Sequence, residues 1–97
     1  MILVKLHKTK DSEILAIADS ELIGKKIENK KISIEVTERF YKGDKLPEEK
    51  IIALIKGSRN INIIGKESIE FALKHNLIEK SSIIKIKNIP HVQIFSL

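Results

Sequence analysis

The stretch from Asn60 to Ile78, NINIIGKESIEFALKHNLI, constrains the fold of this chain more than any other. Its apolar start, a glycine and a later helical periodicity predict a strand over 61–64, a sharp turn and an amphipathic helix over 66–75. Asn76 suits the left-handed conformation in which many helices end. An alternating apolar segment follows at 83–87. Strand, helix and strand in so short a span predict that 61–64 and 83–87 pair in parallel through a right-handed crossover.

Two β-hairpins are predicted before this unit. The first pairs 2–6 with 13–18, and both runs are so continuously apolar that we expect the hairpin to lie centrally in a sheet that is covered on both faces. The second pairs 25–28 with 31–37, where strict alternation of apolar and polar residues predicts a half-buried strand.

Short capping motifs separate these elements. Asp19 and Thr37 are each predicted to cap a single helical turn. A first full helix is expected over 47–56, because a proline and two glutamates favour its start and a glycine ends it. Pro90 interrupts the C-terminal alternation and predicts that 92–95 is an edge strand or a bulged continuation. The fold class expected is mixed α/β: one small domain over 1–97, with two N-terminal β-hairpins followed by a helix-strand-helix-strand unit that contains a parallel strand pair.

The charge balance points to an anionic partner. The 97 residues carry a net charge of +5, and residues 49–97 hold eight basic and four acidic side chains. RNA contacts would then come from Arg59, Lys66, Lys85 and Lys87. The commoner cause of such an excess is lysines scattered over exposed faces.

Composition also limits the setting. The absence of cysteine excludes disulfides and thiolate metal sites and suits the cytoplasm. The apolar start is too short for a signal peptide, and no apolar run reaches the length of a membrane span. Abundant lysine and isoleucine hint at a thermophile or an AT-rich genome.

Few residues of the chain are candidates for a catalytic, anion-binding or metal-binding site. Gly65 and Lys66 between a strand and a helix resemble a phosphate loop, but Asn60 stands where that loop needs glycine and Glu67 where it needs serine or threonine. Only weak anion binding by the free amides of the helix start is expected there. The histidines are far apart in sequence and have no cysteine beside them, so we expect no metal site and no cofactor.

His91 and Gln93 are harder to assign. Alternation places both on one face of an otherwise apolar C-terminal segment, where they either bind a ligand or satisfy backbone groups around Pro90. Tyr41, beside Phe40, is more simply a core anchor than a platform for base stacking.

Four groups of residues, taken together, resemble an archaeal family classified as domain of unknown function 424. The groups are Asp19, Leu22, Gly24 and Lys25; Phe40, Tyr41 and Gly43; Asn62, Ile63, Ile64 and Gly65; and Pro90, His91 and Gln93. The similarity runs from about Lys5 to Phe95; Asn76 and Pro47 depart from the family pattern outside the four groups. The resemblance implies an archaeal, cytosolic protein and favours a role in translation. It implies no particular reaction. The binding positions that it suggests are Asp19, Lys25, Tyr41, Asn62, Gly65, His91 and Gln93.

Two functional hypotheses follow. The first is a non-catalytic module that associates with RNA, the ribosome or a translation factor. The alternative is a small ligand-binding protein or enzyme with an anion or nucleotide site at Gly65, in which His91 acts as acid or base and Asn62 and Gln93 orient the ligand. We expect Asn62, Gly65, His91 and Gln93 to converge at the carboxyl end of the strand 61–64, with His91 over the helix start. A structural subunit is a third interpretation, and a homodimer through the C-terminal edge strand is one option.

Overall fold

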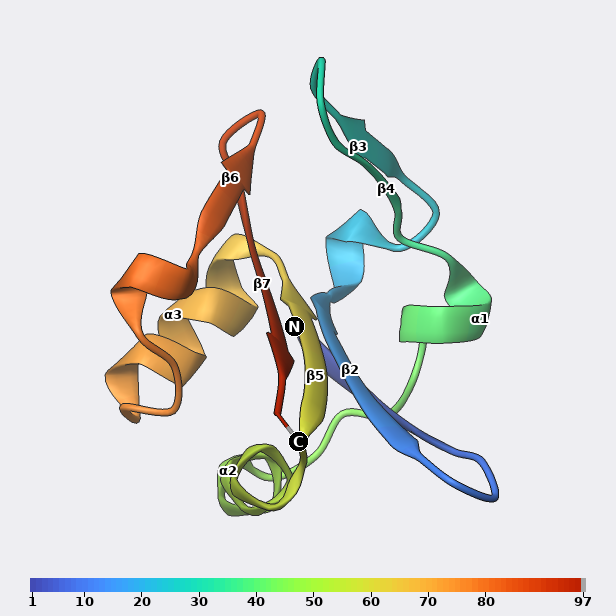
Figure 1. Ribbon diagram of the computed structural model, residues 1–97, viewed down its shortest axis with the longest axis vertical. Coiled ribbons are helices and arrows are strands. Elements are labelled where there is room, and N and C mark those ends of the chain that lie inside the picture. Colours follow the sequence, from blue (N-terminus) through green and yellow to red (C-terminus); the bar gives the residue numbers. More distant parts are fainter. Residues whose placement is uncertain (97) are drawn as a thin grey trace.

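The computed structural model describes residues 1–96 and confirms the mixed α/β class. The elements follow in the order β1 (Ile2–Lys8), β2 (Glu13–Asp19), a 3₁₀ turn η1 (Ser20–Leu22), β3 (Lys26–Glu28), β4 (Ser33–Glu35), α1 (Glu38–Tyr41), α2 (Glu48–Gly57), β5 (Asn60–Ile64), α3 (Lys66–Lys74), a 3₁₀ turn η2 (Lys80–Ser82), β6 (Ile84–Ile86) and β7 (Ile89–Phe95) (Figure 1). Both predicted N-terminal hairpins and both long helices are present. Five strands form one sheet in the order β1-β2-β5-β7-β6, and β3 and β4 form a separate ribbon.

The parallel pair of the sheet joins β2 to β5, with Ile17 opposite Ile63. The predicted parallel pairing of 61–64 with 83–87 is therefore wrong. Lys87 and Asn88 have φ values of 49° and 67°. Such left-handed residues form a two-residue hairpin turn, so β6 folds back onto β7, and β7 pairs antiparallel with β5.

Pro90 lies inside β7, opposite Lys85, in the part of β7 (89–91) that pairs with β6. Within residues 1–96, the segment 92–95 pairs with β5 alone, so the expected edge position is confirmed there. A dimer formed through this edge stays a prediction. The carbonyl oxygen of Pro90 accepts a hydrogen bond from Gly65 N–H at 3.0 Å. The N–H that proline lacks would point past the end of β5, so the ladder loses no bond.

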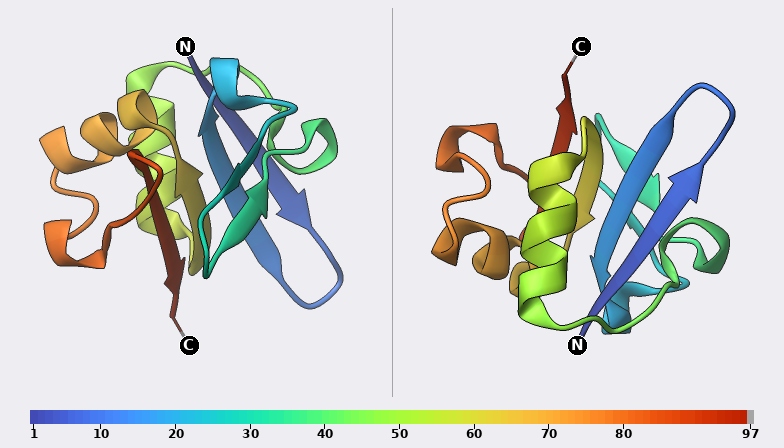
Figure 2. Two further views of the ribbon diagram at one scale, coloured as in Figure 1. Left: turned by 90° about the horizontal axis from the view of Figure 1, so that it is seen from above. Right: turned by 90° about the horizontal axis from the view of Figure 1, so that it is seen from below.

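Helices α2 and α3 cover one face of the sheet, and the β3–β4 ribbon and α1 lie on the other (Figure 2). The helix-side core contains Val4, Leu15, Ile17, Ile51, Ile55, Ile61, Ile63, Ile69, Ala72 and Val92. The ribbon-side core contains Ala16, Ala18, Leu22, Ile27, Val36, Tyr41, Ile64 and Ile86. Strand β2 contributes to both cores, as predicted, whereas β1 is at the sheet edge instead of the centre.

The local capping signals in the sequence behave largely as expected. Thr37 Oγ1 accepts the N–H of Phe40 at 3.2 Å and begins α1. Asn76 has φ 56°, and Leu77 N–H donates to the carbonyl of Ala72 at 2.8 Å, which closes α3 with a left-handed cap. Within residues 1–96, no helix is both long and apolar enough to span a membrane.

Candidate functional site

Asp19, at the end of β2, is only 4% exposed. Its two carboxylate oxygens accept hydrogen bonds from the N–H of Glu67 at 3.0 Å, the N–H of Ser68 at 2.8 Å and the hydroxyl of Ser68 at 2.6 Å. Asp19 therefore caps α3, and the prediction that it caps its own turn is wrong, because η1 has no side-chain cap. The parallel pairing of β2 with β5 explains this, since it brings the end of β2 beside the start of α3.

Gly65 is required by the same arrangement. Its φ is 118°, a conformation that side-chain-bearing residues rarely adopt, and an added Cβ would overlap the carboxyl group of Asp19. The amides of Glu67 and Ser68 already bind Asp19, so this carboxylate occupies the place that the sequence assigned to a weakly bound anion.

Asn62, His91 and Gln93 lie together on β5 and β7, where Asn62 is opposite Gln93 and Ile64 is opposite His91. Gly65 adjoins them through its bond to Pro90. The predicted convergence thus occurs, although by antiparallel pairing. His91 shares the face of Ile64, which packs in the ribbon-side core, while α3 begins on the helix side. His91 therefore does not overhang the helix start.

His91 is almost inaccessible, with 7% of its surface exposed. Its Nδ1 atom is buried and has no hydrogen-bond partner in the described part of the chain. Burial lowers the pKa of His91 below its ordinary value of 6.5, because the charged imidazolium is poorly solvated there. The neutral ring is thus the stable form at neutral pH.

Tyr41 is a core anchor. It is 4% exposed, and burial raises the pKa of its hydroxyl to about 12. Its ring meets Phe40 edge-on at a centroid distance of 4.8 Å. Lys25 is exposed just before β3 and borders a shallow cleft with Glu35 and Thr37. Neither Tyr41 nor Lys25 belongs to the Asn62–Gln93 group.

One row of residues crosses four strands on the ribbon side of the sheet. The register places Lys5 opposite Ala16, Ala16 beside Asn62 and Asn62 opposite Gln93. In the next row His7 is opposite Ile14 and Asn60 is opposite Phe95. Gln93 is exposed and Phe95 is 68% exposed, so α1 and the β3–β4 ribbon leave this end of the face accessible. We call it the open sheet end, defined by Lys5, His7, Asn60, Asn62, Gln93 and Phe95.

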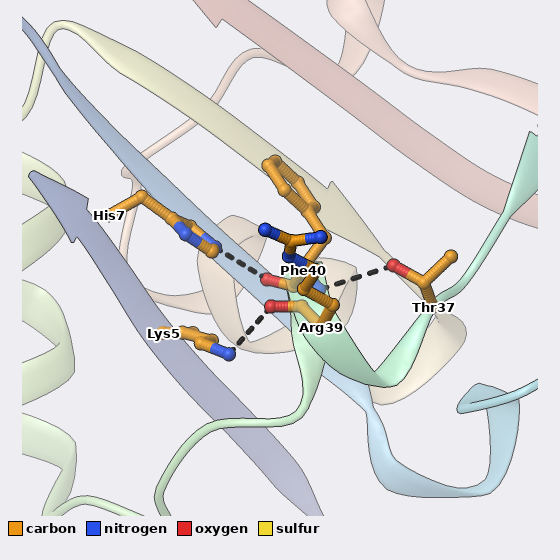
Figure 3. Close-up of a pocket in the computed structure, with 5 residues that line it drawn as sticks. All are labelled: Lys5, His7, Thr37, Arg39 and Phe40. Carbon is orange, nitrogen blue, oxygen red and sulfur yellow. Dashed lines mark hydrogen bonds between the residues drawn. The ribbon is translucent and has the colours of Figure 1, made fainter. Parts of the chain in front are cut away.

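A cavity of ≈ 360 Å³ borders the open sheet end at α1 (Figure 3). Lys5 Nζ donates to the carbonyl of Arg39 at 2.6 Å, and His7 Nε2 lies 2.7 Å from the carbonyl of Phe40. Because a carbonyl oxygen only accepts, His7 carries a proton on Nε2. The rings of His7 and Phe40 stack with centroids 4.7 Å apart and planes 13° from parallel. Thr37 also lines this cavity.

The sequence patterns did not predict this cluster. His7 had been considered only as a possible metal ligand, and Phe40 only as a neighbour of Tyr41. The alternation of β1 does place Lys5 and His7 on one face, which was the available signal. No local sequence pattern predicts the contact of these residues with α1, because that contact depends on how elements distant in sequence pack together.

The predicted RNA contacts do not form one surface. Lys66 and Lys85 line a cleft of ≈ 590 Å³ between α3 and the β6–β7 hairpin. Lys87 borders a separate depression beside Glu28, Asn29 and Lys30. Arg59 lies at the other end of β5, beside the β1–β2 turn.

Three carboxylates, of Asp19, Glu21 and Glu67, offer oxygens that lie within 4.8 Å of one another. The amino group of Met1 is 2.6 Å from Glu67 Oε1, and Asp19 is bonded to α3. Asp19 and Glu67 thus already have partners within the chain.

Comparisons with known proteins agree with this fold. A family model described as "Protein of unknown function (DUF424)" matches residues 7–97. A crystal structure described as that of an uncharacterized conserved protein from Methanopyrus kandleri is similar with a TM-score of 0.78 and 24% sequence identity, over 96% of this chain and 89% of that chain. At this identity the likeness concerns the fold alone. No curated protein matches the chain.

Proposed function

The chain belongs to the DUF424 family, as four groups of its residues predicted, and from that premise we propose that it is a non-catalytic module that binds single-stranded RNA on its open sheet end. The observation that carries this proposal is the row that joins Lys5, Asn62 and Gln93 between two aromatic positions. Such a surface combines what unpaired nucleotides require, namely rings for stacking, amides for base edges and cations for phosphates.

The aromatic positions supply the stacking surfaces. Phe95 is 68% exposed at the end of β7, so its ring is accessible on this face of the sheet. The His7–Phe40 stack stands on the opposite side of the row and is half-exposed. Bases that stack on either ring would leave their edges within reach of the amides of Asn62 and Gln93.

The cations lie on the same side. Arg39 is exposed beside Phe40 and lines the cavity that adjoins the open sheet end. Lys5 is in the row itself, although its ammonium group is already held by the Arg39 carbonyl. We therefore assign phosphate binding mainly to Arg39, whose planar guanidinium suits phosphate oxygens.

The enzyme alternative depends on free amides after Gly65 and on access to His91. Asp19 already accepts hydrogen bonds from two of those amides, and His91 is 7% exposed. Both observations favour the binding module. We propose that the module acts in the cytoplasm, because the chain has no cysteine. We propose a role in translation because the family resemblance favours it.

Fluorescence anisotropy with a labelled oligouridine of about ten nucleotides tests this proposal. Phe95→Ala should weaken binding about fivefold or more, the effect of losing one base-stacking surface. The exposed Lys50→Glu on α2 is the control and should have a much smaller effect. Wild-type affinity should fall about tenfold or more between roughly 50 and 200 mM salt if several phosphates are neutralised. No binding at low salt, or equal binding by Phe95→Ala, would contradict the proposal.

A further inference from the structure

The cleft between α3 and the β6–β7 hairpin differs from the open sheet end in its chemistry. It has a volume of ≈ 590 Å³, within the range of ligand sites in proteins. Its floor is aliphatic, built mainly from Ile69, Leu73 and Ile83. Its rim is formed by Lys66, Lys80 and Lys85, and within residues 1–96 the one acidic residue that lines it is Glu70. The cleft therefore favours a ligand that is both anionic and aliphatic.

We infer that this cleft binds an acidic peptide segment of a partner protein, which inserts aliphatic side chains between α3 and β6. Among residues 1–96, no aromatic ring lines the cleft, so a nucleobase would find no stacking surface there. Leucine and isoleucine side chains match the floor, and neighbouring Asp or Glu residues match the three lysines. The volume admits a few side chains and is too small for a folded domain.

The strand beside the cleft supports a peptide partner. β6 is the last strand in the sheet order and, within residues 1–96, pairs with β7 alone. Ile86 and Ile89 flank the two-residue turn and form the hydrogen-bonded pair of the hairpin, so the next pair, Lys85 with Pro90, is a non-hydrogen-bonded one. The N–H and C=O of Lys85 thus point away from β7. An extended peptide can bond to them as an added strand.

This inference is independent of RNA binding, because the cleft and the open sheet end share no residue. The lysines of the rim are exposed, so charge reversal should leave the fold intact. Selection of a random peptide library, displayed on phage, against the intact chain provides the probe. We expect the enriched sequences to combine acidic residues with Leu or Ile.

A labelled synthetic copy of the consensus peptide then tests the location. The double variant Lys66→Glu and Lys85→Glu should weaken its binding about tenfold or more, because attraction becomes repulsion at the rim. Lys50→Glu and Phe95→Ala should bind it like wild type. If the double variant has a lowered melting temperature, the single variant Lys80→Glu replaces it and must show the weakened peptide binding.

Three results of the peptide experiments would overturn the inference. They are the absence of enriched peptides, a consensus without acidic residues, and binding that survives reversal of the rim charges. In the oligouridine assay, loss of binding in the double variant with no loss in Phe95→Ala would also overturn it, since the cleft would then belong to an RNA surface.

Discussion

Asp19 and Ser68 are joined by two hydrogen bonds, from the backbone N–H at 2.8 Å and from the hydroxyl at 2.6 Å, although 49 residues separate them in the sequence. The contact ties the end of β2 to the start of α3, across the only parallel pairing within residues 1–96. A buried carboxylate is therefore a structural clamp between the two halves of the chain.

Removing the clamp should cost stability. Asp19→Ala leaves two amides and a hydroxyl without partners, so the free energy of unfolding should fall by about 2 to 4 kcal/mol. Ser68→Ala removes one bond and should cost about 1 kcal/mol. Urea unfolding gives both values. The exposed Glu21→Ala is the control, with an expected change under about 0.5 kcal/mol; an equal loss there would show that the burial of Asp19 is unimportant.

Gly65→Ala should destabilise the protein by more than about 2 kcal/mol, because alanine is strained at φ 118° and its Cβ meets Asp19. Gly57→Ala provides a matched control. A Cβ at Gly57 meets open space, so the change should lie between zero and a gain of about 1 kcal/mol. Thermal or urea unfolding distinguishes the two variants. Similar effects at both positions would refute the close approach of Gly65 to Asp19.

Stability should depend on pH through His91. Its pKa is lowered in the folded state, so the unfolded chain binds a proton more readily once the pH falls below 6.5. The free energy of unfolding should therefore decrease as pH drops through that value, by at most about 1.4 kcal/mol per pH unit. Replacing His91 by Gln removes this dependence while the carboxylates titrate as before. Parallel slopes for the two proteins between about pH 7 and 5.5 would rule the prediction out.

The buried face of α3 can be checked directly. Ile69 is 3% exposed and packs in the helix-side core, so Ile69→Ala should cost about 2 to 5 kcal/mol. Lys74 lies on the exposed face, so Lys74→Ala should lower the free energy of unfolding by less than roughly 0.5 kcal/mol. Leu73 is half-buried, so the stability loss of Leu73→Ala should lie between those of Ile69→Ala and Lys74→Ala. Equal losses for the three variants in urea unfolding would mean that another face of the helix is buried.

Arg39 offers a test of the RNA surface that avoids the core. Arg39→Glu should weaken oligouridine binding at low salt and flatten its salt dependence, because one phosphate contact is lost and one repulsion added. Lys31→Glu, an exposed charge reversal in the β3–β4 turn, is the control. Anisotropy titrations at two salt concentrations measure both. An unchanged salt slope in Arg39→Glu would remove this residue from the interface.

Local structure was largely determined by the sequence alone. Both long helices, both N-terminal hairpins, the Thr37 cap and the left-handed Asn76 were predicted close to where they lie. Each depends on side chains within a few residues of one another, which periodicity and capping preferences describe. The adjacency of Asn62, Gly65, His91 and Gln93 was also anticipated, although for the wrong pairing.

The tertiary structure alone decided which strands became neighbours. Several apolar strands offer the same pattern, so nothing in 83–87 distinguished a parallel partner of β5 from one arm of a hairpin with β7. Because the strands pair differently from the prediction, His91 lies on the ribbon side of the sheet and Asp19 accepts hydrogen bonds from amides of α3. For the same reason β6 is an edge strand. The His7–Phe40 stack likewise exists because α1 packs on β1. Contacts between elements distant in sequence depend on which buried surfaces fit together, and local patterns carry no record of that choice.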